Sequence, residues 1–139
     1  MFRKLLVAHD GSEGGAKALE SALDLAERLG ADLHMICVEE LPRFPASMDE
    51  VIEERHEIGH LLHKVVERSR ARAKQRDVKI ETHVVSGHAV PSIVEFIERG
   101  GYDLLVIGYL GHSALYNRLI GSTTDRLVEL APCKVLVVK

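Results

Sequence analysis

Residues 2–12 read FRKLLVAHDGS, a short apolar run that passes directly into a polar turn. The run lacks the polar–apolar alternation of a half-exposed strand, which is typical of a strand buried on both faces of a parallel sheet. Ser12 is suited to cap a helix, and apolar residues then recur at helical spacing from Leu19 to Leu29, just before Gly30. The stretch therefore predicts a buried strand, a turn and a helix that covers the strand.

The same alternation continues along the chain. Further strands are predicted over residues 32–38, 78–85, 103–107 and 134–138, with helices over 49–76 and 122–130 and another introduced by Gly87 and Pro91. Strands that alternate with helices build a parallel sheet with helices on both faces. We predict a single doubly wound α/β domain over residues 1–139.

Composition excludes several classes of protein. The chain has 139 residues, of which 46% are hydrophobic, 28% charged and 4% aromatic, with a formal net charge of −3. This apolar content is enough for a folded core, and the weak negative charge and scarce aromatic rings argue against a nucleic-acid binder. No apolar run approaches the roughly 20 residues of a membrane span, and the first residues lack a signal-like apolar stretch. We expect a cytoplasmic protein with no nucleic-acid or membrane partner.

The most informative segment is residues 108–124, GYLGHSALYNRLIGSTT, which follows the fourth predicted strand. In open parallel sheets, ligands bind beyond the carboxyl ends of the strands where the strand order reverses. Gly108 lets the backbone approach a ligand and Gly111 suits a tight turn, while residues 121–124 open a helix whose free N–H groups can bind an anion. Ordinary turn and cap chemistry explains the same residues, so both interpretations stay open.

Familiar alternatives are absent from the sequence. No Lys precedes Ser122 as a Walker loop requires, and no dinucleotide fingerprint follows the first predicted strand. There is also no nucleophile elbow of the serine hydrolases. Phospho-accepting receiver domains carry an acidic pair at the end of the first strand and the acceptor aspartate on a later strand. Here the first predicted strand ends in a single Asp10 and the fourth ends in Gly108, which argues against a receiver.

Together these residues resemble the nucleotide-binding branch of the universal stress protein family. The likeness is carried by the spacing Gly108-x2-Gly111-x9-Gly121-Ser122-Thr123 and by the segments VAHDGS (7–12), DLLVIG (103–108) and APCKVLVV (131–138). The resemblance implies a Rossmann-like, adenine-nucleotide alpha-hydrolase-like fold with a five-stranded parallel sheet of order 3-2-1-4-5. It also implies that the ligand is ATP, or ADP or AMP, together with Mg²⁺.

The resemblance further implies roles for individual residues. Asp10 would contact the ribose, Val38 would offer its backbone to the adenine, and Ala8 and Ile107 would line the pocket. Residues that would wrap the phosphates are Gly108, Gly111, His112, Gly121, Ser122, Thr123 and Thr124. No catalytic residue is predicted. Transfer of a phosphoryl group needs positive charge to stabilise the transition state, and the only candidate cation in the motif is Arg118, whose direction the sequence does not give.

The family resemblance also implies a homodimer that forms through the C-terminal strand, Lys134 to Val138. An apolar sheet edge is rarely left open in a soluble protein, and pairing with a second copy would cover it. We therefore predict an ATP-binding stress-response and signalling protein with at most slow ATP turnover. Two alternatives stay open: an enzyme that hydrolyses or transfers from the bound nucleotide, and a dimeric interaction protein whose pocket is kept empty by Tyr109.

Eight histidines raise the question of a metal site. His56, His60 and His63 share one arc of the long predicted helix, on a face that we expect to be solvated. His34 and His83 lie on predicted strands, where we expect them to pack or to find a hydrogen-bond partner. No metal site is predicted. Both cysteines, Cys37 and Cys133, are expected to be buried as small hydrophobic residues.

Overall fold

The computed structural model describes residues 2–40, 47–110 and 120–139. Within these residues, nine elements follow one another: β1 (Lys4–Ala8), α1 (Glu13–Leu29), β2 (Asp32–Glu40), α2 (Met48–Gln75), β3 (Ile80–Gly87), α3 (Ala89–Gly100), β4 (Leu104–Gly108), α4 (Ser122–Leu130) and β5 (Lys134–Val138). The five strands form one parallel sheet in the order β3-β2-β1-β4-β5. The predicted fold class and strand order are confirmed.

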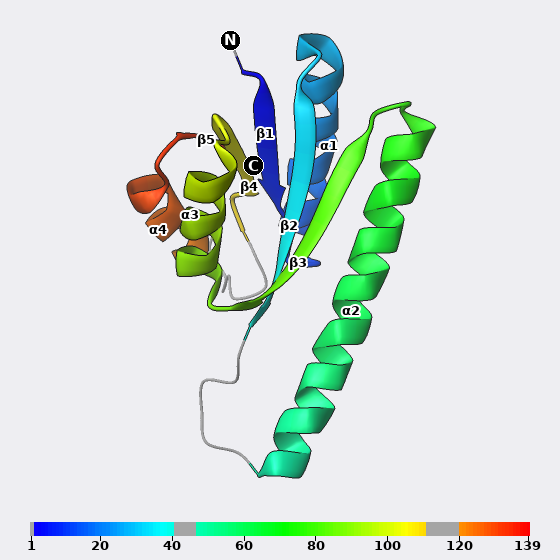
Figure 1. Ribbon diagram of the computed structural model, residues 1–139, viewed down its shortest axis with the longest axis vertical. Helices are drawn as coiled ribbons and strands as arrows, with labels where there is room; N and C mark the ends of the chain where they lie inside the picture. Colours follow the sequence, from blue (N-terminus) through cyan, green and yellow to red (C-terminus); the bar gives the residue numbers. More distant parts are fainter. Residues whose placement is uncertain (1, 41–46, 111–119) are drawn as a thin grey trace.

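Two apolar clusters lie on opposite faces of this sheet, as the doubly wound architecture requires. One cluster packs β1, β2 and β4 against α1 and the carboxyl-terminal half of α2, and the other packs the opposite face against α3 and α4. Figure 1 shows α1 and α2 on one side of the sheet and α3 and α4 on the other. The central residues Leu5, Leu6 and Val7 are fully buried, which explains the absence of alternation in this strand.

Local sequence signals fix the ends of the helices. Ser12 caps α1 by accepting a hydrogen bond from the N–H of Gly15 at 3.0 Å, and Gly30 ends the helix with a φ of 62°. In α2, Ser47 and Glu50 form a reciprocal capping box. The cap predicted at Ser12 and the stop predicted at Gly30 are both confirmed.

Several predicted strand bounds differ from the observed ones by one or two residues, and the start of the third strand is the difference that the structure explains. The third strand begins at Ile80 rather than at Val78, because Val78 belongs to the capping turn that follows α2. Its N–H donates to the carbonyl of Ala73 and the N–H of Asp77 donates to that of Lys74, while Asp77 has a φ of 54°. This is a Schellman motif, in which an aspartate takes the left-handed position that glycine usually occupies.

Candidate functional site

The strand order reverses between β1 and β4, so the chain leaves these neighbouring strands in opposite directions across the sheet. β1 leads to β2, whereas β4 leads to β5 on its other side. Asp10 follows the end of β1 and Gly108 ends β4. The structure therefore places these two predicted site residues at the edge of the sheet where doubly wound proteins bind ligands.

The turn after β1 is held by side chain–backbone hydrogen bonds. The backbone N–H of His9 donates to the carbonyl of Ile36 on β2. The ring of His9 accepts, through Nδ1, a hydrogen bond from the N–H of Gly11 at 3.0 Å. Asp10 accepts from the N–H of Ser12 at 2.9 Å through one carboxylate oxygen, and its side chain is exposed. Gly11 has a φ of 87°, a conformation that L side chains rarely adopt. The turn thus presents a carboxylate to solvent at the carboxyl edge of the sheet.

The end of β4 is joined to the start of α4. The hydroxyl of Thr124 donates to the carbonyl of Gly108 at 2.6 Å, and the N–H of Gly121 donates to the carbonyl of Tyr109 at 2.9 Å. Gly121 is the N-cap and has no side-chain acceptor for the first-turn N–H groups of α4. These bonds place an N-terminal helix end, which favours anions, beside the end of β4.

Glycines also bring α1 close to this edge. A Cβ on Gly108 would lie 2.6 Å from the backbone of Gly14, and a Cβ on Gly14 would lie 1.9 Å from the carbonyl oxygen of Leu110. A Cβ on Gly15 would lie 2.4 Å from Nδ1 of His9. The sequence analysis missed the role of Gly14 and Gly15. Two consecutive glycines at the start of a predicted helix were the available signal, because glycine is unfavourable in helices unless something approaches closely.

The predicted site residues differ in exposure. Ala8 and Val38 are half-buried at the ends of β1 and β2, Ile107 is buried, and Ser122 is exposed at the start of α4. Thr123 is half-buried beside it. Gly111, His112 and Arg118 lie outside the described residues. The described members of the predicted set therefore lie at the carboxyl ends of β1, β2 and β4 or at the first turn of α4.

Tyr109 lies on the β5 side of β4. Its N–H donates to the carbonyl of Val138 at 2.8 Å, and Lys139 Nζ lies 5.4 Å from the centre of its ring. β1 is on the other side of β4. The contact with Lys139 therefore directs the Tyr109 ring toward β5 rather than toward β1.

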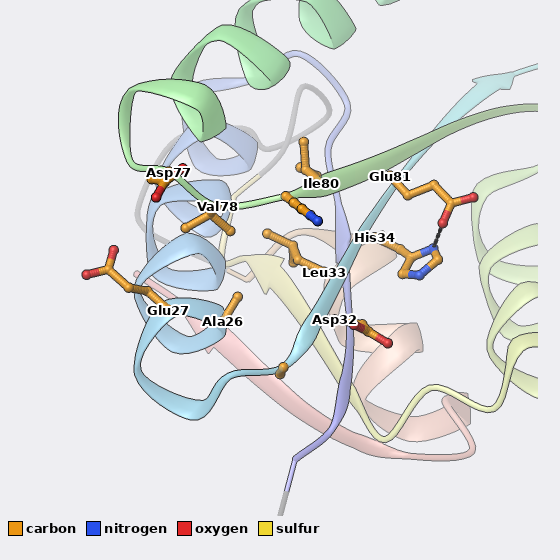
Figure 2. A pocket seen from close by; sticks show the side chains of 11 residues that line it. Ala26, Glu27, Asp32, Leu33, His34, Asp77, Val78, Ile80 and Glu81 are labelled. Atoms are coloured by element: carbon orange, nitrogen blue, oxygen red, sulfur yellow. Dashed lines mark ion pairs between the residues drawn. The ribbon is translucent and has the colours of Figure 1, made fainter.

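A hollow of about 570 Å³ lies at the opposite, amino-terminal edge of the sheet. Figure 2 shows that its lining comes from the end of α1, the loop after α2 and the first residues of β2 and β3. Asp77 and Glu27 lie on one side of it and His34 with Glu81 on the other. None of its lining residues belongs to the predicted nucleotide site.

The remaining predicted features differ in outcome. Cys37 is fully buried, as expected, and burial raises the pKa of its thiol to about 12, with a smaller contribution from the charge of Asp10. Cys133 is only half-buried, so that expectation was partly wrong. His34 and His83 do find a partner, since Nδ1 of the first lies 3.0 Å from Nε2 of the second. His56, His60 and His63 are exposed on α2, as expected.

No helix among residues 2–40, 47–110 and 120–139 combines the length and the apolar character that crossing a membrane requires.

Comparison with known proteins places the chain among its relatives. The model of the universal stress protein family matches residues 1–139. Universal stress protein YxiE of Bacillus subtilis is 31% identical to this chain over 148 aligned residues, which cover 100% of both proteins.

Solved structures agree with this relationship. Universal stress protein UspA of Lactobacillus plantarum superposes with a TM-score of 0.88 at 22% identity, covering 99% of this chain and 98% of that one. A universal stress protein crystallised in complex with cAMP superposes with a TM-score of 0.77 at 25% identity, covering 99% and 97%. The family match over the whole sequence and the shared fold lead to one conclusion: this chain belongs to the universal stress protein family.

Proposed function

We propose that this chain binds an adenine nucleotide at the carboxyl edge of the sheet, between β1 and β4. The observation that carries the proposal is the junction of β4 and α4, where Thr124 and Gly121 hold, beside Gly108, a helix N-terminus whose N-cap glycine has no capping side chain of its own. Such an end binds phosphate through its N–H groups. The relative crystallised with cAMP supports an adenine ligand for this fold.

Each part of the nucleotide has a proposed partner. The exposed carboxylate of Asp10 would accept hydrogen bonds from the ribose hydroxyls, and the backbone of Val38 would face the adenine. Ala8 and Ile107 would line the base and sugar pocket. The phosphates would lie against residues 121–124, with Gly111 and His112 completing the set. We propose ATP with Mg²⁺ as the ligand, with ADP and AMP binding at the same place.

Close packing of backbone supports a phosphate at this edge. Gly14 and Gly108 bring the first turn of α1 against the end of β4, so that the N-termini of α1 and α4 both lie at the carboxyl edge of the sheet. Each helix N-terminus carries a partial positive charge, which favours a phosphate group. Ser12 already occupies one N–H of α1, whereas Gly121 has no side chain with which to do the same for α4. We therefore assign the phosphates to α4.

The proposed role is binding and signalling in a stress response, with at most slow turnover of ATP. Among its described residues, the proposed site contains no lysine or arginine, the residue types that stabilise a transferring phosphoryl group. We also propose a cytoplasmic location and a homodimer formed through β5. That strand is at the sheet edge, and its Leu136 is 37% exposed.

Calorimetric titration with ATP and AMP, with and without Mg²⁺, tests the proposal. We expect saturable binding that weakens about 10- to 100-fold in Asp10→Ala, the range for loss of hydrogen bonds to a charged group. Asp32→Ala is the matched control, since Asp32 is also an exposed aspartate but lies at the amino end of β2. Absence of binding by the wild-type protein, or equal losses in the two variants, would contradict the proposal.

A further inference from the structure

Three side chains with metal-ligand chemistry meet on β2 and β3, at the β3 edge of the sheet. Nδ1 of His34 lies 3.0 Å from Nε2 of His83 and 3.5 Å from a carboxylate oxygen of Glu81. The three donor atoms all lie within 4.8 Å of one another. Figure 2 shows the carboxylate of Glu81, on β3, directed at the ring of His34 on the neighbouring strand. Two imidazoles and one carboxylate form a donor set that binds divalent transition metals.

Strand register creates this cluster. His34 pairs with Glu81 across the two strands, and Ile36 pairs with His83. Paired residues in a sheet share a face, and so do residues two apart in one strand, so all three side chains lie on the same face. Because both strands are hydrogen-bonded along their length, the three donors are positioned by backbone that is already ordered.

Two of the three donor separations suit a small tetrahedral ion, and the third, between His83 and Glu81, is within 4.8 Å. Zinc–nitrogen and zinc–oxygen bonds of about 2.0–2.2 Å place the donors of a tetrahedral site about 3.3 Å apart, and the observed 3.0 and 3.5 Å lie on either side of that value. Without an ion, the two histidine rings are parallel within 1°, with centres 5.3 Å apart, and share a hydrogen bond. Binding would require the rings to tilt so that both lone pairs converge, while the strands stay in place.

Aromatic rings pack against the two histidines of this cluster, and one side of the cluster is open. The rings of Tyr102 and His34 are nearly perpendicular with centres 5.1 Å apart, and the ring centres of Phe96 and His83 are 4.8 Å apart. Burial lowers the pKa of the His34 imidazole. The side chain of Glu81 is 66% exposed, which leaves a path for the ion and a position for water.

Nearby charges are mixed. Glu81 and Asp32 contribute negative charge around His34, whereas Lys4 contributes positive charge. The ammonium of Lys4 donates to the carbonyl of Gly100 at 2.6 Å and lies 4.6 Å from the centre of the Tyr102 ring. It is therefore held by other groups and is not an ion-pair partner of the Glu81 carboxylate.

We infer that His34, Glu81 and His83 form a binding site for a divalent cation of the zinc class, with a further coordination position open to water. The site is independent of the proposed function, because it lies on β2 and β3 whereas the nucleotide is assigned to the β1–β4 switch point. A second histidine pair provides a control. His56 and His60 lie one turn apart on the exposed face of α2, with their Nε2 atoms 3.1 Å apart.

Titration of untagged, chelator-treated, nucleotide-free protein with Zn²⁺ tests the inference. The wild-type chain should bind one Zn²⁺, and Co²⁺ in its place should give the absorption bands of a site with nitrogen and oxygen ligands. Glu81→Gln and His83→Gln should each weaken Zn²⁺ binding about tenfold or more. A double variant, His56→Gln with His60→Gln, removes the other histidine pair and should bind Zn²⁺ as the wild type does.

The outcomes separate the two histidine clusters. Glu81→Gln changes one exposed side chain without changing its size. The site is supported if this variant loses Zn²⁺ binding while its metal-free form unfolds at the same temperature as the wild type. Absence of Zn²⁺ binding by the wild type would overturn the inference. So would unchanged affinity in both Glu81→Gln and His83→Gln, or loss of binding only in the double variant of α2.

Discussion

Gly14→Ala should destabilise the protein, although alanine is the better helix former. Gly14 lies in the first turn of α1, and a Cβ there would lie 1.9 Å from the carbonyl oxygen of Leu110 and 3.1 Å from its carbonyl carbon. Normal contacts between such atoms are about 3.5 Å. Relief of this overlap requires α1 or the backbone after β4 to move by more than about 1 Å, because no flexible side chain can give way.

The magnitude follows from two opposing effects. Overpacking of a well-packed site costs about 1–3 kcal/mol, and the helix propensity of alanine returns at most about 1 kcal/mol. The difference spans about 0–3 kcal/mol, and we expect a net loss near its middle, about 1–2 kcal/mol. For a chain of this length that corresponds to a fall in Tm of roughly 3–8 °C.

Gly59→Ala is the matched control for this prediction. Gly59 also lies within a helix, α2, but a Cβ there would meet no atom within 4 Å. We expect this substitution to stabilise the protein by about 0.5–1 kcal/mol, because it removes only the conformational freedom of glycine. Urea unfolding followed by far-UV circular dichroism measures both variants. A Gly14→Ala protein as stable as the wild type would refute the argument that α1 packs on the end of β4 through this glycine.

Other residues give further predictions. Leu23→Ala, at a fully buried position in α1, should lower the free energy of unfolding by about 2–5 kcal/mol in the same urea assay. Cys37, whose pKa is raised to about 12 by burial, should resist alkylation in the native state and react on unfolding; rapid native labelling would contradict its placement. Tyr109→Ser should leave nucleotide affinity unchanged in calorimetry, since the ring faces β5; tighter binding would show that it restricts the site. A hydrogen bond from Arg72 lowers the pKa of Glu20 below its ordinary value of 4.5. The stabilisation that the ionised Glu20 contributes to the folded state is therefore present above pH 4.5 and is lost as the pH falls through the lowered pKa. In Arg72→Gln, Tm measured against pH should therefore fall less steeply below that value, and an unchanged slope would contradict the pairing.

Much of the fold could be predicted because its signals are local. The apolar run in β1, the cap at Ser12 and the glycine stop at Gly30 each act within a few residues, and all of them are confirmed. The start of β3 was misplaced because Asp77 adopts the left-handed conformation without being glycine. The sequence there has no glycine that would predict such a turn.

Contacts between distant parts of the chain were harder to predict. The glycines of residues 14 and 15 could be seen in the sequence, but not that one of them faces Leu110 and the other His9. His34 and His83 were expected to find hydrogen-bond partners, yet their pairing with each other depends on the register of β2 and β3. Strand order likewise followed from the family resemblance, because alternation of strands and helices alone permits several orders.

The most direct test of nucleotide binding between β1 and β4 is to locate the ligand. Amide chemical shifts, followed by NMR while AMP or ATP is added, report which backbone groups it contacts. We predict that the largest changes fall on residues 8–12, 38, 107–110 and 121–124, with residues 31–34 and 78–81 at the opposite edge unchanged. Changes confined to the hollow at the amino ends of β2 and β3, or no changes at saturating nucleotide, would contradict the assignment.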